Sequence, residues 1–356
     1  MSAPALQSPG VVNPATSFYF HRAVGFGWYP IVHMVELGAK LFGGEVRPLP
    51  SRGRDRLHRL KLVARRAPRG DDLISVFVLR GPGEARSLGR VPEFFSVPQR
   101  RILWIIESFR TDDIPHRRIL DQFDAVVFTQ EFETPVYEKI VGERALWLGF
   151  GTDALDLGCA GPARPVDVLR IGRQPPAWDD DERAAAACRT RGLTFAGRPP
   201  FIKSAQDQQR SLMQDYCGRA KFMVAHSNLA APAPYTHPTK EYITARWTDA
   251  LASGASIAGV TPRSELDLID CPGGLLNFDR IDLEHNIEAI AAAAADWKPY
   301  QPLVNHLHAL KTLDWRWRFA RLADYLGLDP APLRADLQRL KARIDFVEGA
   351  LRAQAA

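Results

Sequence analysis

Cysteine and methionine are scarce in this chain, with four of each among 356 residues. Cys159, Cys188, Cys217 and Cys271 lie far apart, without a C-x-x-C pair or a histidine at ligand spacing. This pattern argues against both a zinc site and a disulfide framework. The sequence therefore predicts reduced thiols in a cytoplasmic protein.

Long apolar runs are also missing. No segment approaches the roughly 20 apolar residues that a membrane-spanning helix needs. Residues 1–16 have neither a basic start nor an apolar stretch, so we expect a disordered lead-in there rather than a signal peptide.

Charge is nearly balanced, with a formal net charge of +5. That value permits an anionic substrate, an anionic membrane surface or nucleic acid, and selects none of them. The positive residues gather between positions 47 and 69, in a run without aromatic residues. Because single-stranded nucleic acid is bound through aromatic stacking, we expect no nucleic-acid partner. Anionic lipid head groups, an anionic saccharide or plain solvent remain as alternatives.

Strand and helix patterns alternate through most of the chain, which is typical of a doubly wound α/β protein. We expect two Rossmann-like domains, at 17–155 and 156–330, joined by the Gly- and Pro-rich stretch 151–167. Expected strands are Leu73–Leu79, 102–106, 125–129, 145–148, 168–171, 193–196, 222–225 and 256–260. Expected helices are 31–42, 117–122, Thr134–Val141, 180–191 and 205–217.

Helices dominate the end of the chain, at 287–297, 302–323 and 331–356. The last carries an apolar stripe with spacings of three and four. We expect the stripe to pack on the body of the protein or on a second copy in a homodimer. Docking at a membrane surface is the alternative. The stripe consists of Leu333, Leu337, Leu340, Ile344, Val347 and Leu351.

Residues 237–260 form the most informative segment. They are interpreted as a loop, a helix that includes Glu241, a stop at Gly254 and a buried strand. Lys240 stands in the loop before the helix, where the backbone amides of a helix start favour anions and the charge of Lys240 adds to the field. A solvated loop with Thr239 as the N-cap is the alternative. The alternative is an ordinary amphipathic helix packed on a sheet.

The pattern Thr-x-Arg-x-x-Asp-Ala-Leu-Ala-Ser-Gly-Ala, which starts at Thr244, resembles the C-terminal domain of group-1 glycosyltransferases with the GT-B fold. The resemblance implies that Asp249 binds the ribose of a nucleotide-sugar donor. It also implies that Gly172 and Arg173, directly after a strand, meet the donor diphosphate, with Arg246 and Lys240 as further cations. An ion pair between Arg173 and the acids at 179–181 is the alternative.

Glu241 lies eight residues before Asp249. The family signature includes an earlier acid, so Glu241 either faces the donor sugar, stabilises the helix start or does neither.

Two further groups are candidates in the first half. His21, Gly25 and Gly27 belong to a loop that could approach an acceptor. Glu107 and Asp113 follow a strand and are candidates for a catalytic base, with helix capping as the alternative.

The resemblance implies a GT-B glycosyltransferase that moves a sugar from a nucleotide diphosphate to a glycan or lipid-linked acceptor. It further implies retention of anomeric configuration, no cofactor and no obligatory metal, because no D-x-D motif stands in a suitable loop. A sugar-nucleotide 2-epimerase of the same fold and a non-catalytic ligand-binding protein are the alternatives. Peripheral attachment to the inner face of a membrane is a further expectation.

Overall fold

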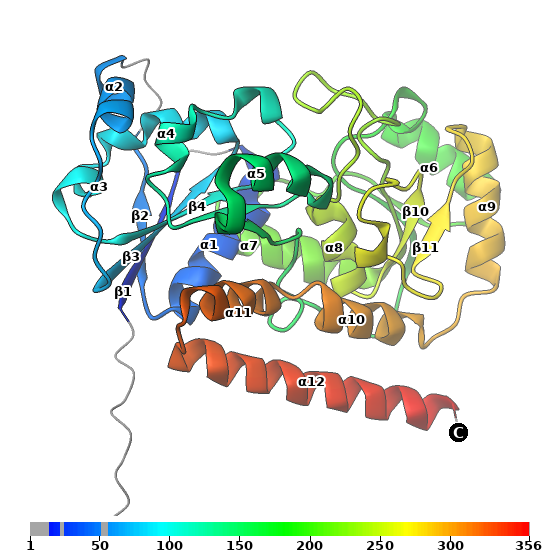
Figure 1. Cartoon of the computed structure of the whole chain (residues 1–356). Helices are drawn as coiled ribbons and strands as arrows, with labels where there is room; N and C mark the ends of the chain where they lie inside the picture. Colours follow the sequence, from blue (N-terminus) through cyan, green and yellow to red (C-terminus); the bar gives the residue numbers. More distant parts are fainter. Residues whose placement is uncertain (1–13, 22–24, 51–55, 356) are drawn as a thin grey trace, which may run out of the picture.

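Two parallel β-sheets, one from each half of the chain, form the framework of the protein (Figure 1). The computed structural model describes residues 14–21, 25–50 and 56–355, so the expected lead-in lies almost wholly outside the described residues. The first sheet has the order β2-β1-β3-β4-β5-β6 and the second β11-β10-β9-β7-β8. The strands are β1 (Ala15–Phe20), β2 (Glu45–Pro48), β3 (Leu73–Leu79), β4 (Arg100–Ile105), β5 (Ala125–Phe128), β6 (Ala145–Trp147), β7 (Val166–Arg170), β8 (Phe195–Ala196), β9 (Ala220–Val224), β10 (Ser256–Gly259) and β11 (Leu275–Asn277).

Each sheet is covered on both faces, which confirms the doubly wound α/β prediction. In β3, Val76 faces one hydrophobic core and Phe77 faces another, and both are fully buried. Strands of this kind are apolar at nearly every position, and this makes them recognisable in the sequence. The helices are α1 (Tyr29–Leu41), α2 (Arg56–Ala64), α3 (Glu93–Ser96), α4 (Arg117–Leu120), α5 (Thr134–Val141), α6 (Asp181–Thr190), α7 (Ala205–Arg210), α8 (Ala245–Ala252), α9 (Leu283–Ala295), α10 (Gln301–Thr312), α11 (Trp315–Leu326) and α12 (Ala331–Ala355).

The strand β1, which lies between β2 and β3, corrects one expectation. Residues 17–20, expected in a loop before the first helix, pair in parallel with both β2 and β3. Phe18 and Phe20 enter one core while Tyr19 enters the other, so these aromatic residues form a strand buried on both faces. The edge strands β2 and β11 also differ from the expectation, because their residues are largely exposed or half-buried and lack an apolar run.

The helix of the informative segment is shorter than expected. α8 begins at Ala245 with Thr244 at its N-cap position, so Glu241 lies in the preceding loop and Thr239 is not the cap. Contacts with the first half hold this loop in place. The Lys240 ammonium pairs with Glu133, and the Tyr242 ring stacks on Phe109.

The expected helix 302–323 is split where the chain crosses between the halves. Thr152 donates its backbone N–H to the Leu313 carbonyl and accepts from the Trp315 N–H, both at 2.9 Å. This short bridge interrupts the helix and separates α10 from α11. α10 packs on α8 of the second half, whereas α11 and α12 pack on α1 of the first, so the chain returns to its first half.

The apolar stripe of α12 lies against its own chain. Leu333, Leu340 and Val347 are almost fully buried, against α1, α10 and α11. The expectation of packing on the body is therefore confirmed. A homodimer through the C-terminal helix and docking at a membrane stay predictions, since Leu337, Ile344 and Leu351 of the stripe are only half-buried. Within the described ranges, no helix combines the length and the apolar character needed to cross a membrane.

Candidate functional site

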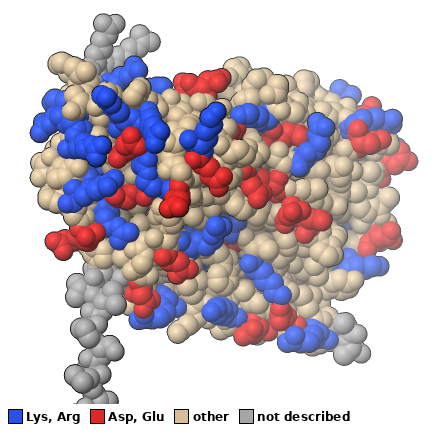
Figure 2. Space-filling view, in the orientation of Figure 1, with Lys and Arg blue, Asp and Glu red and all other residues tan. Residues whose placement is uncertain are grey.

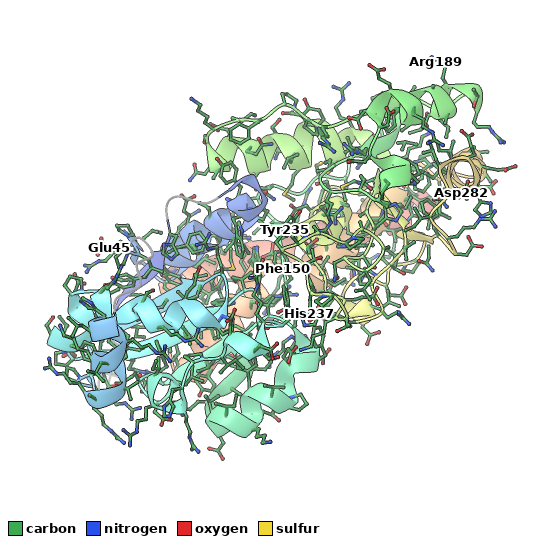
Figure 3. All side chains as sticks on the ribbon, turned by 90° about the horizontal axis from the view of Figure 1, so that it is seen from above. Glu45, Phe150, Arg189, Tyr235, His237 and Asp282 are labelled. Carbon is green, nitrogen blue, oxygen red and sulfur yellow. The ribbon has the colours of Figure 1, made fainter. Side chains whose placement is uncertain are left out.

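A cavity of about 490 Å³, the central cavity, lies between the two sheets. Ile106 and Glu107 on its wall directly follow β4, and Ile171 and Gly172 directly follow β7. The cavity therefore opens at the carboxyl ends of both sheets. Within the first sheet β1 lies between β2 and β3, and within the second sheet β7 lies between β8 and β9, so the strand order reverses at β1 and at β7. Doubly wound proteins bind ligands at such reversals. Figure 3 shows Phe150 and Tyr235, two of its lining residues, in the middle of the molecule between the two halves.

Gly172 and Arg246 pack closely on the second-half wall. Gly172 has a φ of +70°, and a Cβ there would lie 3.2 Å from the Arg246 Cδ. The Arg246 guanidinium donates to the carbonyls of Arg173 at 2.7 Å and His226 at 3.3 Å. Partial burial, and after it the charge of the neighbouring Arg173, lowers the pKa of Arg246 to about 10, so the guanidinium stays charged at neutral pH.

Arg173 is half-buried, with its guanidinium 5.4 Å from the centre of the Tyr235 ring. The alternative ion pair with the acids at 179–181 does not form. Asp179 and Asp181 pair with the buried Arg170, and the Asp180 carboxylate caps α6. The Arg173 guanidinium thus lines the central cavity without one of these acids as its partner.

Two buried polar atoms on the cavity wall have no hydrogen-bond partner within the described part of the chain, namely Arg173 Nε and Thr244 Oγ1. Both lie beside the start of α8, where the backbone N–H groups of a helix are unpaired and attract anions. Buried polar groups in proteins are rarely left unpaired. The arrangement thus suits an anion with several acceptor oxygens, such as a phosphate.

Asp249, one turn further along α8, is buried on the same wall. Its carboxylate accepts from Thr152 Oγ1 and from Gln209 Nε2, each at 2.7 Å. Burial raises the pKa of Asp249 to about 6, although both hydrogen bonds lower it. A carboxylate here can accept further hydrogen bonds from neighbouring hydroxyl groups.

Glu107 lies on the opposite wall, in the first half. Its carboxylate is 2.6 Å from the Arg110 guanidinium. Burial raises the pKa of Glu107, and Arg110 lowers it in part. Asp113, the second candidate base, is exposed and faces Gly83, away from the cavity wall.

Of the glycine loop after β1, only part reaches the cavity. Both glycines are exposed, but Gly27 lines the cavity and Gly25 lies outside the lining. His21 ends up buried beyond β1, with its Nε2 3.8 Å from Glu84. Residues 22–24 of this loop are outside the described residues.

Lys240 and Glu241 belong to the loop before α8 and are not among the cavity-lining residues. Lys240 forms an ion pair with the buried Glu133 of the first half. The Glu241 carboxylate accepts from the backbone N–H and the Nε of Arg263, at 3.2 and 3.1 Å. The structure therefore brings Gly172, Arg173, Thr244, Arg246 and Asp249 together and leaves these two residues outside.

Aromatic contacts between the halves are the main feature that sequence reasoning missed. The rings of Phe109 and Tyr242 stack with their centres 4.3 Å apart. On another side, the Tyr29 hydroxyl donates to the Lys203 carbonyl at 3.0 Å, and its ring lies 6.1 Å from Phe201. All but Lys203 line the central cavity. Aromatic residues in otherwise polar loops, such as Phe201, were the only signal in the sequence.

Among the described residues, no group of three or more His, Cys, Asp or Glu side chains is placed to hold a metal ion. Positive charge at the central cavity comes from arginine side chains.

Comparison with known proteins identifies the fold. No protein-family model matches the chain, and no curated protein matches it in sequence. Among solved structures, Anabaena HepE in complex with UDP and glucose is 10% identical, with a TM-score of 0.51 over 88% of this chain and 99% of HepE. A glycosyltransferase from Rickettsia africae is 9% identical, with a TM-score of 0.50 over 88% of this chain and 98% of that chain.

The TarM protein of S. aureus also matches, at 10% identity and a TM-score of 0.45, over 72% of this chain and 55% of TarM. The chain thus spans about half the length of TarM. The similarity to HepE and to the Rickettsia protein confirms the GT-B fold of two Rossmann-like sheets with a helical C-terminal region.

Proposed function

We propose that this protein is a glycosyltransferase that uses a nucleotide diphosphate-sugar as donor. One observation carries the proposal: in a GT-B fold, the cavity at the carboxyl ends of both sheets brings a helix start together with Arg173, Arg246 and the buried Asp249 carboxylate. Of the structural relatives, the Rickettsia protein is a glycosyltransferase, and HepE was solved in complex with UDP and glucose. These similarities support the proposal through the fold alone.

The donor is proposed to lie along α8. The Asp249 carboxylate accepts from the ribose hydroxyls. The diphosphate contacts the start of the helix, the Thr244 hydroxyl and Arg173, while the charge of the half-buried Arg246 adds to the positive field. The sugar then points toward Glu107 and the first half. Lys240 is proposed to act indirectly, because its ion pair with Glu133 holds the loop before α8 on the first half.

Arg173 is proposed to contribute most during bond breaking. The bond between the anomeric carbon and the diphosphate oxygen breaks, and its electron pair stays on the diphosphate. The new bond joins the anomeric carbon to the acceptor oxygen, whose proton passes to the departing diphosphate in a retaining reaction. Fixed positive groups that face such a growing negative charge lower the barrier without further reorganisation. The proposed reaction needs no obligatory metal ion, since Arg173 and Arg246 supply the positive charge.

Turnover of nucleotide-sugars tests the proposal. We expect release of nucleoside diphosphate from at least one of the UDP-, GDP-, ADP-, CDP- or dTDP-sugars, and we expect release to persist in EDTA. The matched control is Arg189→Ala, an exposed arginine on α6 at the far end of the second half (Figure 3). Isomerisation of the donor without an acceptor would instead indicate an epimerase, and no reaction of any donor would overturn the proposal.

Attachment to an anionic membrane is a second part of the proposal. α2 exposes Leu57 and Leu60, three residues apart and 69% and 62% exposed, with Arg59 and Lys61 beside them. Arg65, just after the helix, is also exposed. Lys and Arg side chains gather on this end of the first half (Figure 2). Apolar side chains among basic ones are the composition that binds anionic lipid surfaces.

A further inference from the structure

A second cavity lies on the first half, outside the central cavity. It is a groove between residues 111–117 and α5, which we name the side groove. Its wall is mostly aliphatic, with two cations and one hydroxyl group. The lining residues are Thr111, Ile114, Pro115, Arg117, Pro135, Val136, Lys139 and Ile140.

The charge at the side groove is positive. Arg117 is 73% exposed, and the nearest acid paired with it is Asp121, at the long distance of 3.9 Å. Lys139 is also exposed, on the opposite side of the groove. Asp113, which is close in sequence, faces Gly83 and so does not neutralise the groove. An exposed ion pair with a separation of 3.9 Å is weak, so Arg117 remains able to bind an anion.

The side groove adjoins the central cavity. Thr111 lines the groove, and Phe109, two residues earlier, lines the central cavity. The Lys240 ammonium lies 3.5 Å from the Thr111 hydroxyl, at the boundary between the two. A molecule that extends from Glu107 along the first half would therefore pass Thr111 and enter the side groove.

The side groove also adjoins the basic helix α2. α2 packs on α4, and α4 begins with Arg117 of the groove. Figure 1 shows α2 and α4 next to each other at the same end of the first half. A lipid at the exposed leucines of α2 is thus near the groove.

We propose that the side groove binds the phosphate and the first chain carbons of a lipid-linked acceptor. Arg117 and Lys139 contact the phosphate, and the chain lies on Ile114, Val136 and Ile140. The lining residues include no aromatic side chain on which a sugar ring could stack and only one uncharged hydrogen-bonding side chain, Thr111, so the wall suits an apolar chain rather than a glycan. This inference rests on the proposed glycosyl transfer, because it identifies the acceptor class of that reaction.

Binding of geranyl phosphate to the full-length protein tests the inference. We expect saturable binding by titration calorimetry, with geraniol and inorganic phosphate each much weaker, because the groove combines charge with an apolar wall. Arg117→Ala and Lys139→Ala should each weaken binding about three- to fivefold, which corresponds to an exposed charge pair of up to about 1 kcal/mol. Val136→Asp should weaken it further by placing a negative charge on the wall.

Arg118→Ala is the matched control. Arg118 is the exposed neighbour of Arg117 on α4 but does not line the groove, so its loss should change geranyl phosphate binding less than twofold. Equal effects of Arg117→Ala and Arg118→Ala would overturn the inference, as would geraniol binding as tightly as geranyl phosphate. Failure of the wild type to bind geranyl phosphate would overturn it too. Melting temperatures of all variants check that they are folded.

The test separates the side groove from the proposed function. Geranyl phosphate binding is measured without nucleotide, whereas the proposed function is tested by donor turnover. Donor turnover with no geranyl phosphate binding refutes only the acceptor class. Geranyl phosphate binding without turnover of any donor refutes the transferase and, with it, the role of the groove in accepting sugar.

Discussion

Thr152 donates a hydrogen bond from its hydroxyl to the Asp249 carboxylate, with 2.7 Å between the oxygens. The backbone of Thr152 also pairs with Leu313 and Trp315, where the returning chain crosses between the halves. The carboxylate proposed to bind ribose is therefore bonded directly to the crossing point. The proposed donor site and the connection between the halves share one buried network.

The first prediction concerns Asp249 and pH. Because burial raises its pKa to about 6, a growing fraction of the carboxyl is protonated below that value. Ribose hydroxyls donate better to the charged form, so donor affinity should rise severalfold between about pH 5 and pH 7. Calorimetric titration of nucleoside diphosphate at several pH values measures this. Asp249→Asn should bind more weakly and lose the step near pH 6.

The Asp249 carboxyl also makes the stability of the fold depend on pH, in the direction opposite to that of donor affinity. Its pKa in the folded protein lies above the value near 3.9 of an unfolded chain, so the folded state binds more protons between about pH 4 and 6. The contribution of Asp249 to the free energy of unfolding is complete below about pH 4 and is lost as the pH rises through about 6. In unliganded protein, Asp249→Asn should flatten this part of the urea stability profile. An unchanged profile would contradict the raised pKa.

The second prediction separates Arg173 from Asp249 by kinetics. Loss of a charge-assisted donor that acts in the transition state costs about 10²–10³ in turnover, so Arg173→Ala should lower kcat by that amount. Asp249→Asn should mainly raise the donor KM, because ribose is unchanged in the reaction. Initial-rate measurements over a donor series give both constants. If folded Arg173→Ala turned over normally, the phosphate role would pass to Arg246.

The third prediction concerns Glu107 and stereochemistry. A retaining reaction in which the departing phosphate accepts the proton does not need Glu107 as a base. Glu107→Gln should therefore keep turnover within about tenfold, and the product should have the anomeric configuration of the donor, as seen by proton NMR. General-base catalysis contributes about 10²–10⁴. A loss of that size together with an inverted product would make Glu107 the base of an inverting enzyme.

The fourth prediction concerns membrane attachment through α2. The triple change Arg59→Ser, Lys61→Ser and Arg65→Ser should weaken sedimentation with phosphatidylglycerol-containing vesicles, since each basic residue contributes about 1 kcal/mol near an anionic surface. The effect should shrink in high salt. Donor hydrolysis should stay nearly unchanged, because these residues lie outside the central cavity. Loss of hydrolysis with intact vesicle binding would assign this segment to the active site. Arg52 and Arg54 of the same run lie outside the described residues.

The fifth prediction concerns Arg316, whose fully buried side chain pairs with four aspartates where the halves join. Removal of one partner from a buried ion-pair network costs about 3–5 kcal/mol, so Arg316→Met should strongly destabilise the protein in urea unfolding. Arg339 pairs with two of the same aspartates but is 52% exposed. Arg339→Met should cost less than about 1 kcal/mol. Equal losses would mean that burial of Arg316 is unimportant.

The fold was predictable where residues repeat a local pattern. β3 and α5 have the predicted bounds, because an apolar strand run and a Pro-initiated helix depend mainly on nearby residues. β1 was missed because a strand that lies between two others and is buried on both faces is recognised by its partners, which are distant in the sequence. Its partners in β3 lie 58 residues away, in the register Ala15–Leu73 and Thr16–Ile74.

The site was predictable where a motif fixes the backbone and unpredictable where distant segments meet. Gly172, Arg173 and Asp249 stand on local strand–loop–helix units, so their approach to one cavity follows from the fold. Lys240 and Glu241 could not be placed, because the start of α8 depends on contacts with Glu133 and Phe109 of the other half. The pairing of Thr152 with Asp249 joins residues 97 positions apart and leaves no local signal.

Nucleoside diphosphate binding is the most direct test of the proposed donor site. Melting temperatures of the wild type with UDP, GDP, ADP, CDP and dTDP should identify at least one that stabilises the fold. A nucleoside diphosphate at a hundredfold excess over its Kd stabilises the folded state by about 2.7 kcal/mol. The shift should be smaller in Asp249→Asn and unchanged in Arg189→Ala. The absence of a shift with every diphosphate, or an equal shift in both variants, would contradict a nucleotide site at the central cavity.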